Sequence, residues 1–378
     1  MERKLLVAAG ALCTGVLLVL GVMDSVPADD ERLRRIWMST DFSETTIDLD
    51  EVRSGGPPKD GIPAIDDPEF VTPAQAASWL HPREPVAVVE VAGEAKAYPL
   101  QVLTWHEIVN DAVGGVPVAL TFCPLCNSTI TFDRRVDGQV LEFGVSGLLR
   151  RSNLLMFDRQ TESWWQQLTG EAVVGRFAGA ELAVVPSSIV AFEDFRERWP
   201  EAPVLSRDTG HDRPYGRNPY RGYDRVGTRP FLLEGPPDPR LPAMERVLGI
   251  RVGEAVAIYP FSALEEQPLV NDVVGETPVV AMRPTSMLSV LDAPEIAESR
   301  SIPAAVAYGR QLGDRLLHFE LRDGRVHDRE TGSRWNLFGE AVAGPLKGRR
   351  LPELDAGVHF AFAWLAFRPG SRIYQPES

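Results

Sequence analysis

The two halves of this chain repeat one another, and this internal repeat limits the possible folds more than any other feature of the sequence. Three blocks recur in the same order: residues 93–99 as 253–260, residues 110–118 as 271–279, and residues 158–175, in part, as 328–344. The offset between the copies grows only from 160 residues (93 to 253) to 169 residues (175 to 344). We therefore predict two tandem pseudo-repeat halves that pack together.

Each half has more strand patterns than helix patterns. Residues 86–92 and 94–98 flank a glycine as the strands of a hairpin do, and residues 116–122 form a strand pattern that ends at Cys123. The Asp137-Gly138 pair suits a tight turn between residues 129–136 and 139–145. Helical spacing predicts helices over residues 100–112 and 189–198. The sequence therefore predicts an α+β fold dominated by strands.

Composition changes along the chain predict five segments. Residues 206–245 are rich in Pro, Gly, Tyr and Arg and have no regular period, yet so many aromatic residues argue against a loose linker. We expect an ordered strap across the junction of the halves, or alternatively a loop that contacts a ligand. The predicted segments are a signal anchor or signal peptide (1–30), an irregular lead-in (31–74), a first repeat with the Cys-x-x-Cys site (75–205), the strap (206–245) and a second, degenerate repeat (246–378).

The first thirty residues have the pattern of an export signal. A short charged stretch at residues 2–4 precedes an apolar run from Leu5 to Met23, and polar residues follow. The run is long enough to cross a bilayer, which favours an uncleaved membrane anchor, although cleavage after Ala28 is the alternative. With basic residues before the run and acidic ones after it, we expect the body at the extracytoplasmic face of the cell membrane, or secreted or periplasmic if the leader is cleaved.

The overall charge argues against nucleic acid as a partner. The formal net charge is −14, whereas binding to a phosphate backbone requires clustered Lys and Arg. With 44% hydrophobic residues the chain can bury one or two ordinary cores. No protein partner can be named from these numbers.

Comparing the two copies narrows the candidate site to residues that only the first copy has. At an offset of 161 residues, Cys123 and Cys126 align with Pro284 and Met287, while His106 aligns with Gln267. Glu107, next to His106, aligns with Pro268. Residues that both copies keep, such as Asp158 and its Thr, Ser and Trp neighbours, are most simply structural.

The leading hypothesis is a site for a soft metal ion. Thiolate and imidazole ligands suit copper or zinc, and we place copper before zinc. The predicted ligands are Cys123, Cys126 and His106, with Glu107 or Asp133 orienting the imidazole. Arg150 and Arg151 could receive an anion if the fold brings them to the cysteines.

Two other interpretations of the cysteine pair remain open. The pair could form a dithiol-disulfide couple, or one cysteine could be a nucleophile with His106 as its base. The β-branched residues after Cys126 continue as a strand, so the helix of a thioredoxin-like site is missing. Alternatively the pair is a structural clip in a binding module without catalytic activity. The sequence leaves open whether the chain is an enzyme.

Several long motifs resemble the large family of exported bacterial and archaeal proteins known as domain of unknown function 3179. They include the segments 98–100, 105–111, 121–126, 132–134, 143–149, 215–220 and 238–247. The resemblance spans about residues 75 to 370. It implies an exported protein in which the cysteine pair and His106 belong to the family pattern, and it implies no established reaction.

Overall fold

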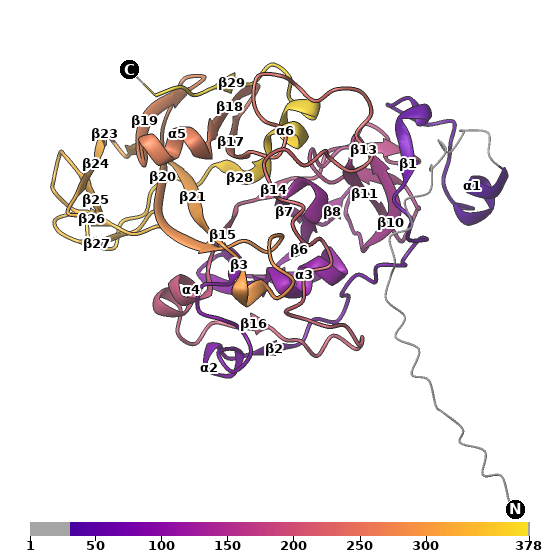
Figure 1. Ribbon diagram of the computed structural model, residues 1–378, viewed down its shortest axis with the longest axis horizontal. Helices are drawn as coiled ribbons and strands as arrows, with labels where there is room; N and C mark the ends of the chain where they lie inside the picture. The colour runs from indigo at the N-terminus through magenta and orange to yellow at the C-terminus, as the bar shows by residue number, and fades with distance from the viewer. Residues whose placement is uncertain (1–30, 377–378) are drawn as a thin grey trace, which may run out of the picture.

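The computed structural model describes residues 31–376, and strands dominate this part of the chain, which confirms the predicted α+β class (Figure 1). The predicted leader, residues 1–30, lies outside the described residues. Within residues 31–376 no helix is both long and apolar enough to cross a membrane. The described helices are all short: α1 (Glu31–Ile36), α2 (Pro73–Ala76), α3 (Leu100–His106), α4 (Phe192–Arg198), α5 (Phe261–Glu266) and α6 (Ala361–Phe367), with 3-10 turns η1 (Leu49–Glu51), η2 (Pro124–Cys126) and η3 (Ile296–Glu298).

A five-stranded sheet contains the first predicted hairpin. Val86 and Val88 pack into one apolar cluster while Ala87 and Val89 pack into another, because alternate side chains of a strand point to opposite faces. Both faces of this sheet are therefore covered. Its order is β15 (Ser187–Ala191), β3 (Pro85–Val91), β4 (Glu94–Pro99), β16 (Val204–Leu205) and β2 (Phe70–Val71). Because β15 precedes α4, the helix predicted over residues 189–198 begins three residues later than expected, at Phe192.

A four-stranded sheet positions the cysteine turn. Its order is β14 (Val184–Val185), β7 (Ser128–Asp133), β6 (Val116–Cys123) and β5 (Ile108–Val113). The helix predicted over residues 100–112 is wrong beyond His106. Glu107 ends α3 with a left-handed backbone (φ 60°), and β5 then pairs with β6. The β-branched Ile108 and Val109 are fully buried in this sheet, an arrangement that suits a strand better than a helix.

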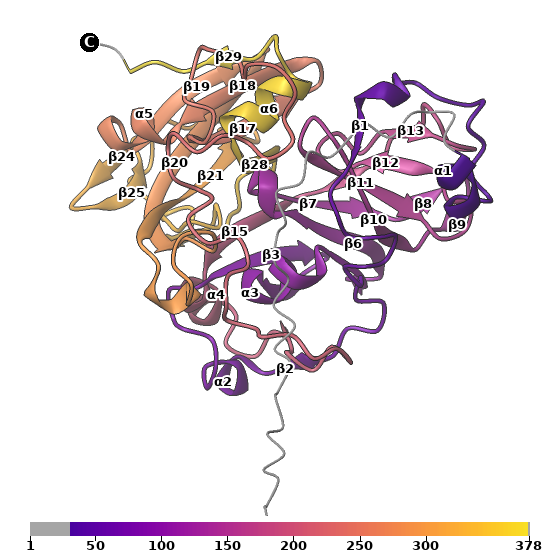
Figure 2. The same ribbon diagram turned by 45° about the vertical axis from the view of Figure 1, so that its right-hand side comes forward.

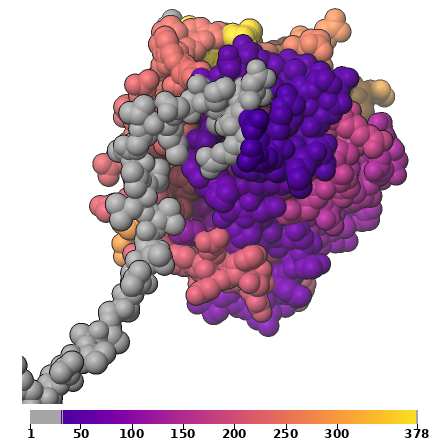
Figure 3. All heavy atoms as spheres, turned by 90° about the vertical axis from the view of Figure 1, so that its right-hand side faces the viewer, coloured from indigo at the N-terminus to yellow at the C-terminus, as the bar shows by residue number. Residues whose placement is uncertain are grey.

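A third sheet of the first half includes part of the lead-in. Its order is β1 (Val52–Ser54), β10 (Phe143–Arg150), β11 (Asn153–Asp158), β12 (Trp164–Gln166) and β13 (Ala172–Val174). The lead-in that the sequence predicts to be irregular therefore supplies an edge strand, and Figure 3 shows it in indigo lying over the first half. The Asp137-Gly138 hairpin exists but is short, because only β8 (Arg135–Val136) and β9 (Gln139–Val140) pair there.

The second half has the same strand orders as the first. β28-β17-β18-β29 corresponds to β15-β3-β4-β16, and β24-β25-β26-β27 corresponds to β10-β11-β12-β13. The internal duplication stays a prediction, and these matching orders support it. The strands are β17 (Arg246–Val252), β18 (Ala255–Pro260), β19 (Leu269–Val274), β20 (Thr277–Leu288), β21 (Ser301–Gly309), β22 (Gln311–Leu312), β23 (Arg315–Leu316), β24 (Phe319–Arg322), β25 (Arg325–Asp328), β26 (Arg334–Trp335), β27 (Ala341–Ala343), β28 (Asp355–Phe360) and β29 (Arg372–Ile373).

The same polar turn recurs in both halves. Asp158 accepts hydrogen bonds from the backbone N–H of Thr161 (2.6 Å) and from the Trp165 indole (2.9 Å). Asp328 accepts the equivalent bonds from Thr331 (2.6 Å) and Trp335 (2.9 Å). These aspartates hold a turn together, which is the structural role predicted for residues that both copies keep.

The largest difference between the halves occurs at the cysteine turn. In the first half the three residues of η2 join β6 to Asn127 and β7. In the second half β20 continues past a bulge, and the chain returns to β21 only after residue 300. We call residues 284–300 the extension.

The strap, residues 206–245, contains no helix or strand but is hydrogen-bonded to both halves. The Trp105 indole of α3 donates to the Arg217 carbonyl (3.1 Å). On the other side, the backbone N–H of Asn218 donates to Pro294 (2.9 Å) and that of Gly222 donates to Asp292 (2.8 Å), both in the extension. The strap is thus ordered and lies between α3 and the extension.

One large apolar cluster contains residues of both halves. Phe122 and Cys123 of the first half belong to the same buried cluster as Met287, Leu291 and Phe360 of the second. Figure 2 shows the first half, indigo to magenta, beside the second half, orange to yellow. The cysteine turn therefore lies in the interior of the whole molecule.

Candidate functional site

The cysteine turn connects two adjacent antiparallel strands. Cys123 is the last residue of β6 and pairs in register with Ser128, the first residue of β7. Pro124 opens the 3-10 turn η2, and Asn127 closes it with a left-handed backbone (φ 47°). A strand follows Cys126, as predicted. Both thiols are free, and both are buried, with 2% of Cys123 and 0% of Cys126 exposed.

The Cys123 thiol accepts several hydrogen bonds. Burial alone would raise the pKa of Cys123, since it disfavours a charge. Hydrogen bonds from the Cys126 thiol and from the backbone N–H groups of Leu154, Cys126 and Leu125 outweigh burial and hold the pKa of Cys123 below its usual value. Of the two thiols, Cys123 is therefore the one that loses its proton more readily.

The Cys126 thiol has the opposite tendency. Burial, the hydrogen bond to Cys123 and the negative charge of the Cys123 thiolate together raise the pKa of Cys126 well above its usual value. Its sulfur lies 3.4 Å from the Ser152 carbonyl and 3.4 Å from the Asn153 amide nitrogen. Cys126 therefore keeps its proton, and its S–H has two acceptors in reach, the Ser152 carbonyl and the Cys123 sulfur.

Glu107 supplies a neutral carboxyl group next to the thiols. Burial, reinforced by the negative charge of Cys123, raises the pKa of Glu107 to about 8, although a hydrogen bond from the Tyr220 hydroxyl (3.3 Å) opposes the shift. Since Glu107 ends α3 in a left-handed backbone conformation, the backbone fixes the direction of its side chain. The predicted role of Glu107 in orienting His106 stays a prediction. Among the predicted site residues, the one whose charge shifts the pKa of Glu107 is Cys123.

His106 is buried but bonds to other partners. Its Nδ1 lies 2.7 Å from the Pro63 carbonyl, which requires a proton on this nitrogen, so Nε2 accepts from the Tyr215 hydroxyl at 2.6 Å. Burial, with smaller contributions from the charges of His211 and Arg213, lowers the pKa of His106 to about 4, although the hydrogen bond to the Pro63 carbonyl opposes the shift. The imidazole is therefore neutral and both of its nitrogens are occupied.

The remaining predicted site residues form ion pairs. Asp133 makes a bidentate pair with Arg135, which lowers the pKa of its carboxyl. Arg150 and Arg151 belong to the turn between β10 and β11 that also contains Ser152, but their guanidinium groups bind Glu51 at 2.8 and 3.0 Å. Their proposed contact with an anion stays a prediction.

Two tyrosines of the strap cover the thiols. Burial raises the pKa of Tyr220 and of Tyr223, and the charges of Glu107 and the two cysteines raise them further, so both phenols remain neutral. The Tyr223 ring also packs against Phe360 of the second half (centroids 6.2 Å apart). The strap therefore lies next to the thiols, and the alternative prediction that it contacts a ligand stays a prediction.

The sequence analysis missed the amide network behind the turn. Asn153 donates to Gln167 (2.9 Å) and accepts from Gln166 (2.6 Å), and Gln167 in turn donates to Thr121 (2.9 Å). All four side chains are buried. The pair of glutamines after two tryptophans was a signal, because buried amides need partners, but the pattern does not identify those partners.

A metal site is not evident among the described side chains. Within residues 31–376 no group of three or more His, Cys, Asp or Glu side chains is arranged to hold a metal ion. Cys123 and Cys126 are in contact, whereas His106 would have to give up the Tyr215 hydroxyl to offer Nε2 to an ion. Copper or zinc binding by these three residues stays a prediction.

Comparison with protein families gives a match to the family described as "Protein of unknown function (DUF3179)", over residues 59–371. This match confirms the resemblance noted in the sequence. No curated protein and no solved structure matches the chain.

Proposed function

Since the chain belongs to this family, whose description names no reaction, we propose a function from the site itself: Cys123 and Cys126 form a dithiol-disulfide couple. One observation carries the proposal. Two free thiols lie together in one buried turn, where hydrogen bonds and burial shift their pKa values in opposite directions, next to a carboxyl group with a pKa of about 8. Opposite pKa shifts suit Cys123 as the thiolate that attacks a substrate disulfide and Cys126 as the thiol that later displaces the substrate from the mixed disulfide.

The reaction begins with Cys123. Its thiolate attacks one sulfur of a substrate disulfide, which forms a mixed disulfide and releases the other substrate sulfur as a thiolate. Glu107 donates its proton to that leaving thiolate, whose release is thereby favoured. Three backbone N–H groups stabilise the Cys123 thiolate before the attack.

The second step completes the exchange. The Glu107 carboxylate takes the proton from Cys126, and the Cys126 thiolate attacks the Cys123 sulfur of the mixed disulfide. The bond to the substrate breaks, the second substrate thiolate leaves, and Cys123 and Cys126 are joined. The substrate disulfide has gained two electrons and the cysteine pair has lost two. The reverse sequence oxidises a substrate dithiol.

The expected location of the protein suits this chemistry. An exported body works in an oxidising compartment, where a disulfide couple persists. Since both thiols are buried, substrate reaches Cys123 only when Tyr220 and Tyr223 of the strap move aside.

Native mass spectrometry of the full chain tests the proposal. After incubation with oxidised glutathione, the wild type should lose the mass of two hydrogen atoms, and Cys126→Ser should instead accumulate a glutathione adduct on Cys123. With Cys13, the third cysteine of the full chain, replaced by Ser in every protein tested, Cys123→Ser should show neither change. A wild-type mass that stays unchanged under oxidised glutathione in partly unfolding urea as well as in buffer would contradict the couple.

The same spectra test the metal hypothesis. Loading the reduced chain with copper(I) or zinc(II) should add one ion if Cys123, Cys126 and His106 are ligands, and His106→Ala should then weaken binding. A chain that takes up no metal while it still forms the internal disulfide would favour the redox function alone.

A further inference from the structure

A cavity lies between the two halves, apart from the cysteine thiols. It has a volume of about 60 Å³, which is room for roughly four to six water molecules. Its walls come from β3, β7 and β15 of the first half and from β17, β21 and β28 of the second. Apolar side chains form much of this wall, among them Val88, Ile189, Trp199 and Val306.

Two buried oxygen atoms of the wall have no hydrogen-bond partner. Thr129 is only 7% exposed, and its Oγ1 is unpaired. The Oε2 atom of Glu90 is also unpaired, although Oε1 of the same carboxylate binds Arg350. A buried unpaired acceptor costs about 1–3 kcal/mol, so these atoms favour a donor in the cavity.

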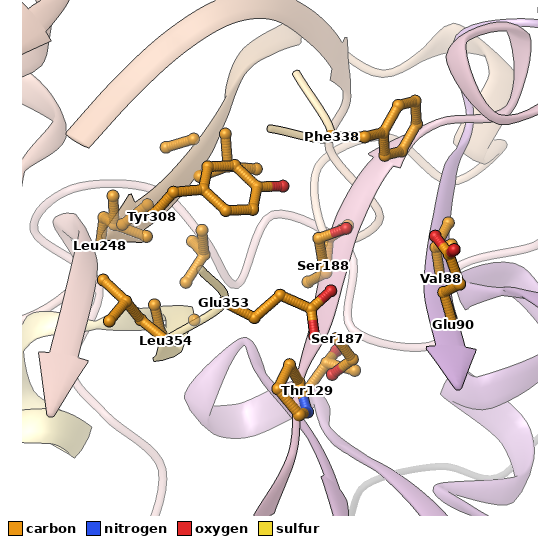
Figure 4. A pocket seen from close by; sticks show the side chains of 18 of the residues that line it. Val88, Glu90, Thr129, Ser187, Ser188, Leu248, Tyr308, Phe338, Glu353 and Leu354 are labelled. Atoms are coloured by element: carbon orange, nitrogen blue, oxygen red, sulfur yellow. The ribbon is translucent and has the colours of Figure 1, made fainter. Parts of the chain in front are cut away.

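The cavity has more negative than positive charge. Its charged lining residues are Glu90, Glu353 and Arg350, two carboxylates against one guanidinium. Figure 4 shows the Glu353 side chain extended toward Ser187 and Ser188, with Glu90 on a separate strand. The Glu353 side chain is 44% exposed, so this carboxyl group lies at the mouth. Burial raises the pKa of Glu353, and the charge of Glu90 adds to the shift although Arg350 opposes it.

We propose that this cavity binds a primary ammonium group on a short alkyl chain. An ammonium has three N–H donors and no acceptor, which suits the unpaired oxygens of Glu90 and Thr129. Its single positive charge balances the excess carboxylate, and the alkyl chain lies along the apolar wall. A neutral alcohol of the same size supplies one donor and no charge, so it fits less well.

Calorimetric titration of the full chain tests this site. The probes are n-butylammonium, for a free amine, and Nα-acetyl-lysine amide, for an ammonium carried by a peptide, with n-butanol as the neutral control. We expect at least one ammonium to bind and butanol to bind at least about tenfold more weakly, the effect of losing charged hydrogen bonds. The ammonium probe that binds more tightly shows whether the cavity takes a free amine or an ammonium carried by a peptide.

Variants then locate the binding. Glu90→Gln should weaken the better probe about tenfold or more, and Thr129→Val should weaken it several-fold. Glu276→Gln removes one charge from an exposed turn and should leave the affinity unchanged. If Glu90→Gln fails to fold, the affinity of Thr129→Val decides the test, since this variant retains the ion pair between Glu90 and Arg350. The proposal is overturned if neither ammonium binds, if butanol binds equally well, or if both cavity variants retain wild-type affinity.

Discussion

Among single residues, Cys126 offers one of the hydrogen bonds that lower the pKa of Cys123. Replacing Cys126 with Ala removes this donor, whereas Ser retains an O–H in the same place. We expect the pKa of Cys123 to rise in Cys126→Ala and to rise less in Cys126→Ser. The rate of alkylation of Cys123 between about pH 5 and 9 measures both values. Identical profiles in the two variants would show that the hydrogen bond has no such effect.

Glu107 makes stability depend on pH with a definite sign. Its pKa is raised from 4.5 to about 8 on folding, so between these values the native state holds a proton that the unfolded state has lost. Stability contributed by this group is complete below pH 4.5 and falls as pH rises to 8, by at most about 5 kcal/mol. Glu107→Gln should therefore flatten the decline and be the more stable protein at pH 8.

Urea unfolding at several pH values measures the free energies of unfolding of the wild type and Glu107→Gln, both with reduced cysteines. Burial depresses the pKa of His106 to about 4 and that of His359 to about 3, so their contributions increase as pH rises toward 6.5. They are common to both proteins and cancel in the comparison. A difference that does not change between pH 5 and 8 would mean that Glu107 ionises normally.

Sequence comparison found the chemical residues but not all of their neighbours. Cys123, Cys126 and Glu107 stand out because the second copy lacks them, and the structure brings them together. His106 was expected beside them because the second copy lacks it as well. It is buried as predicted, but at a helix end adjacent side chains diverge, and its bonds go to Pro63 and Tyr215. Long-range contacts such as those of Asn153 leave no local pattern.

Among the elements, the strap places Tyr220 and Tyr223 next to the thiols. Asp224, directly after Tyr223, is buried and binds Arg246 (2.8 Å), Arg300 (2.6 Å) and Ser289 (2.5 Å) of the second half. We expect Asp224→Asn to loosen the strap and to increase the rate of Cys123 alkylation several-fold. Val226→Ala changes a strap side chain that is 68% exposed, and it should leave the rate unchanged.

Mass spectrometry under native conditions measures the rate of Cys123 alkylation in Asp224→Asn, Val226→Ala and the wild type. Circular dichroism of Asp224→Asn must show that the fold is intact, so that faster labelling reports local opening. Equal labelling of Asp224→Asn and wild type would mean that the thiols open by another route.

Regular elements were more predictable than their boundaries. The β3–β4 hairpin and the strands around the cysteines follow from alternation and from glycine turns. The helix prediction failed after His106, because Val102, Trp105 and Val109 fit helical spacing by chance. The run Ile108–Val113 is mostly β-branched or small, and pairing with β6 overrides the helical pattern.

At the scale of the whole molecule, the apolar cluster with residues of both halves predicts a single unfolding transition. Leu155 of the first half and Leu264 of the second are both fully buried. Replacing either with Ala should cost about 2–5 kcal/mol and shift the entire transition. Far-ultraviolet circular dichroism and tryptophan fluorescence in urea should change together for both variants. A second transition that only one variant shifts would show that the halves unfold separately.

The extension has a consequence for how such proteins diverge. It occupies the position where the first half has its cysteine turn, and its residues 292 and 294 hold the strap that covers that turn. If the extension were shorter, the strap would lose the carbonyl groups that accept its hydrogen bonds. If the strap were changed, the extension would lose the N–H groups that donate to it. Among relatives, the length and sequence of the two segments should therefore covary, although Ser289 and Asp224 are separated by 65 positions.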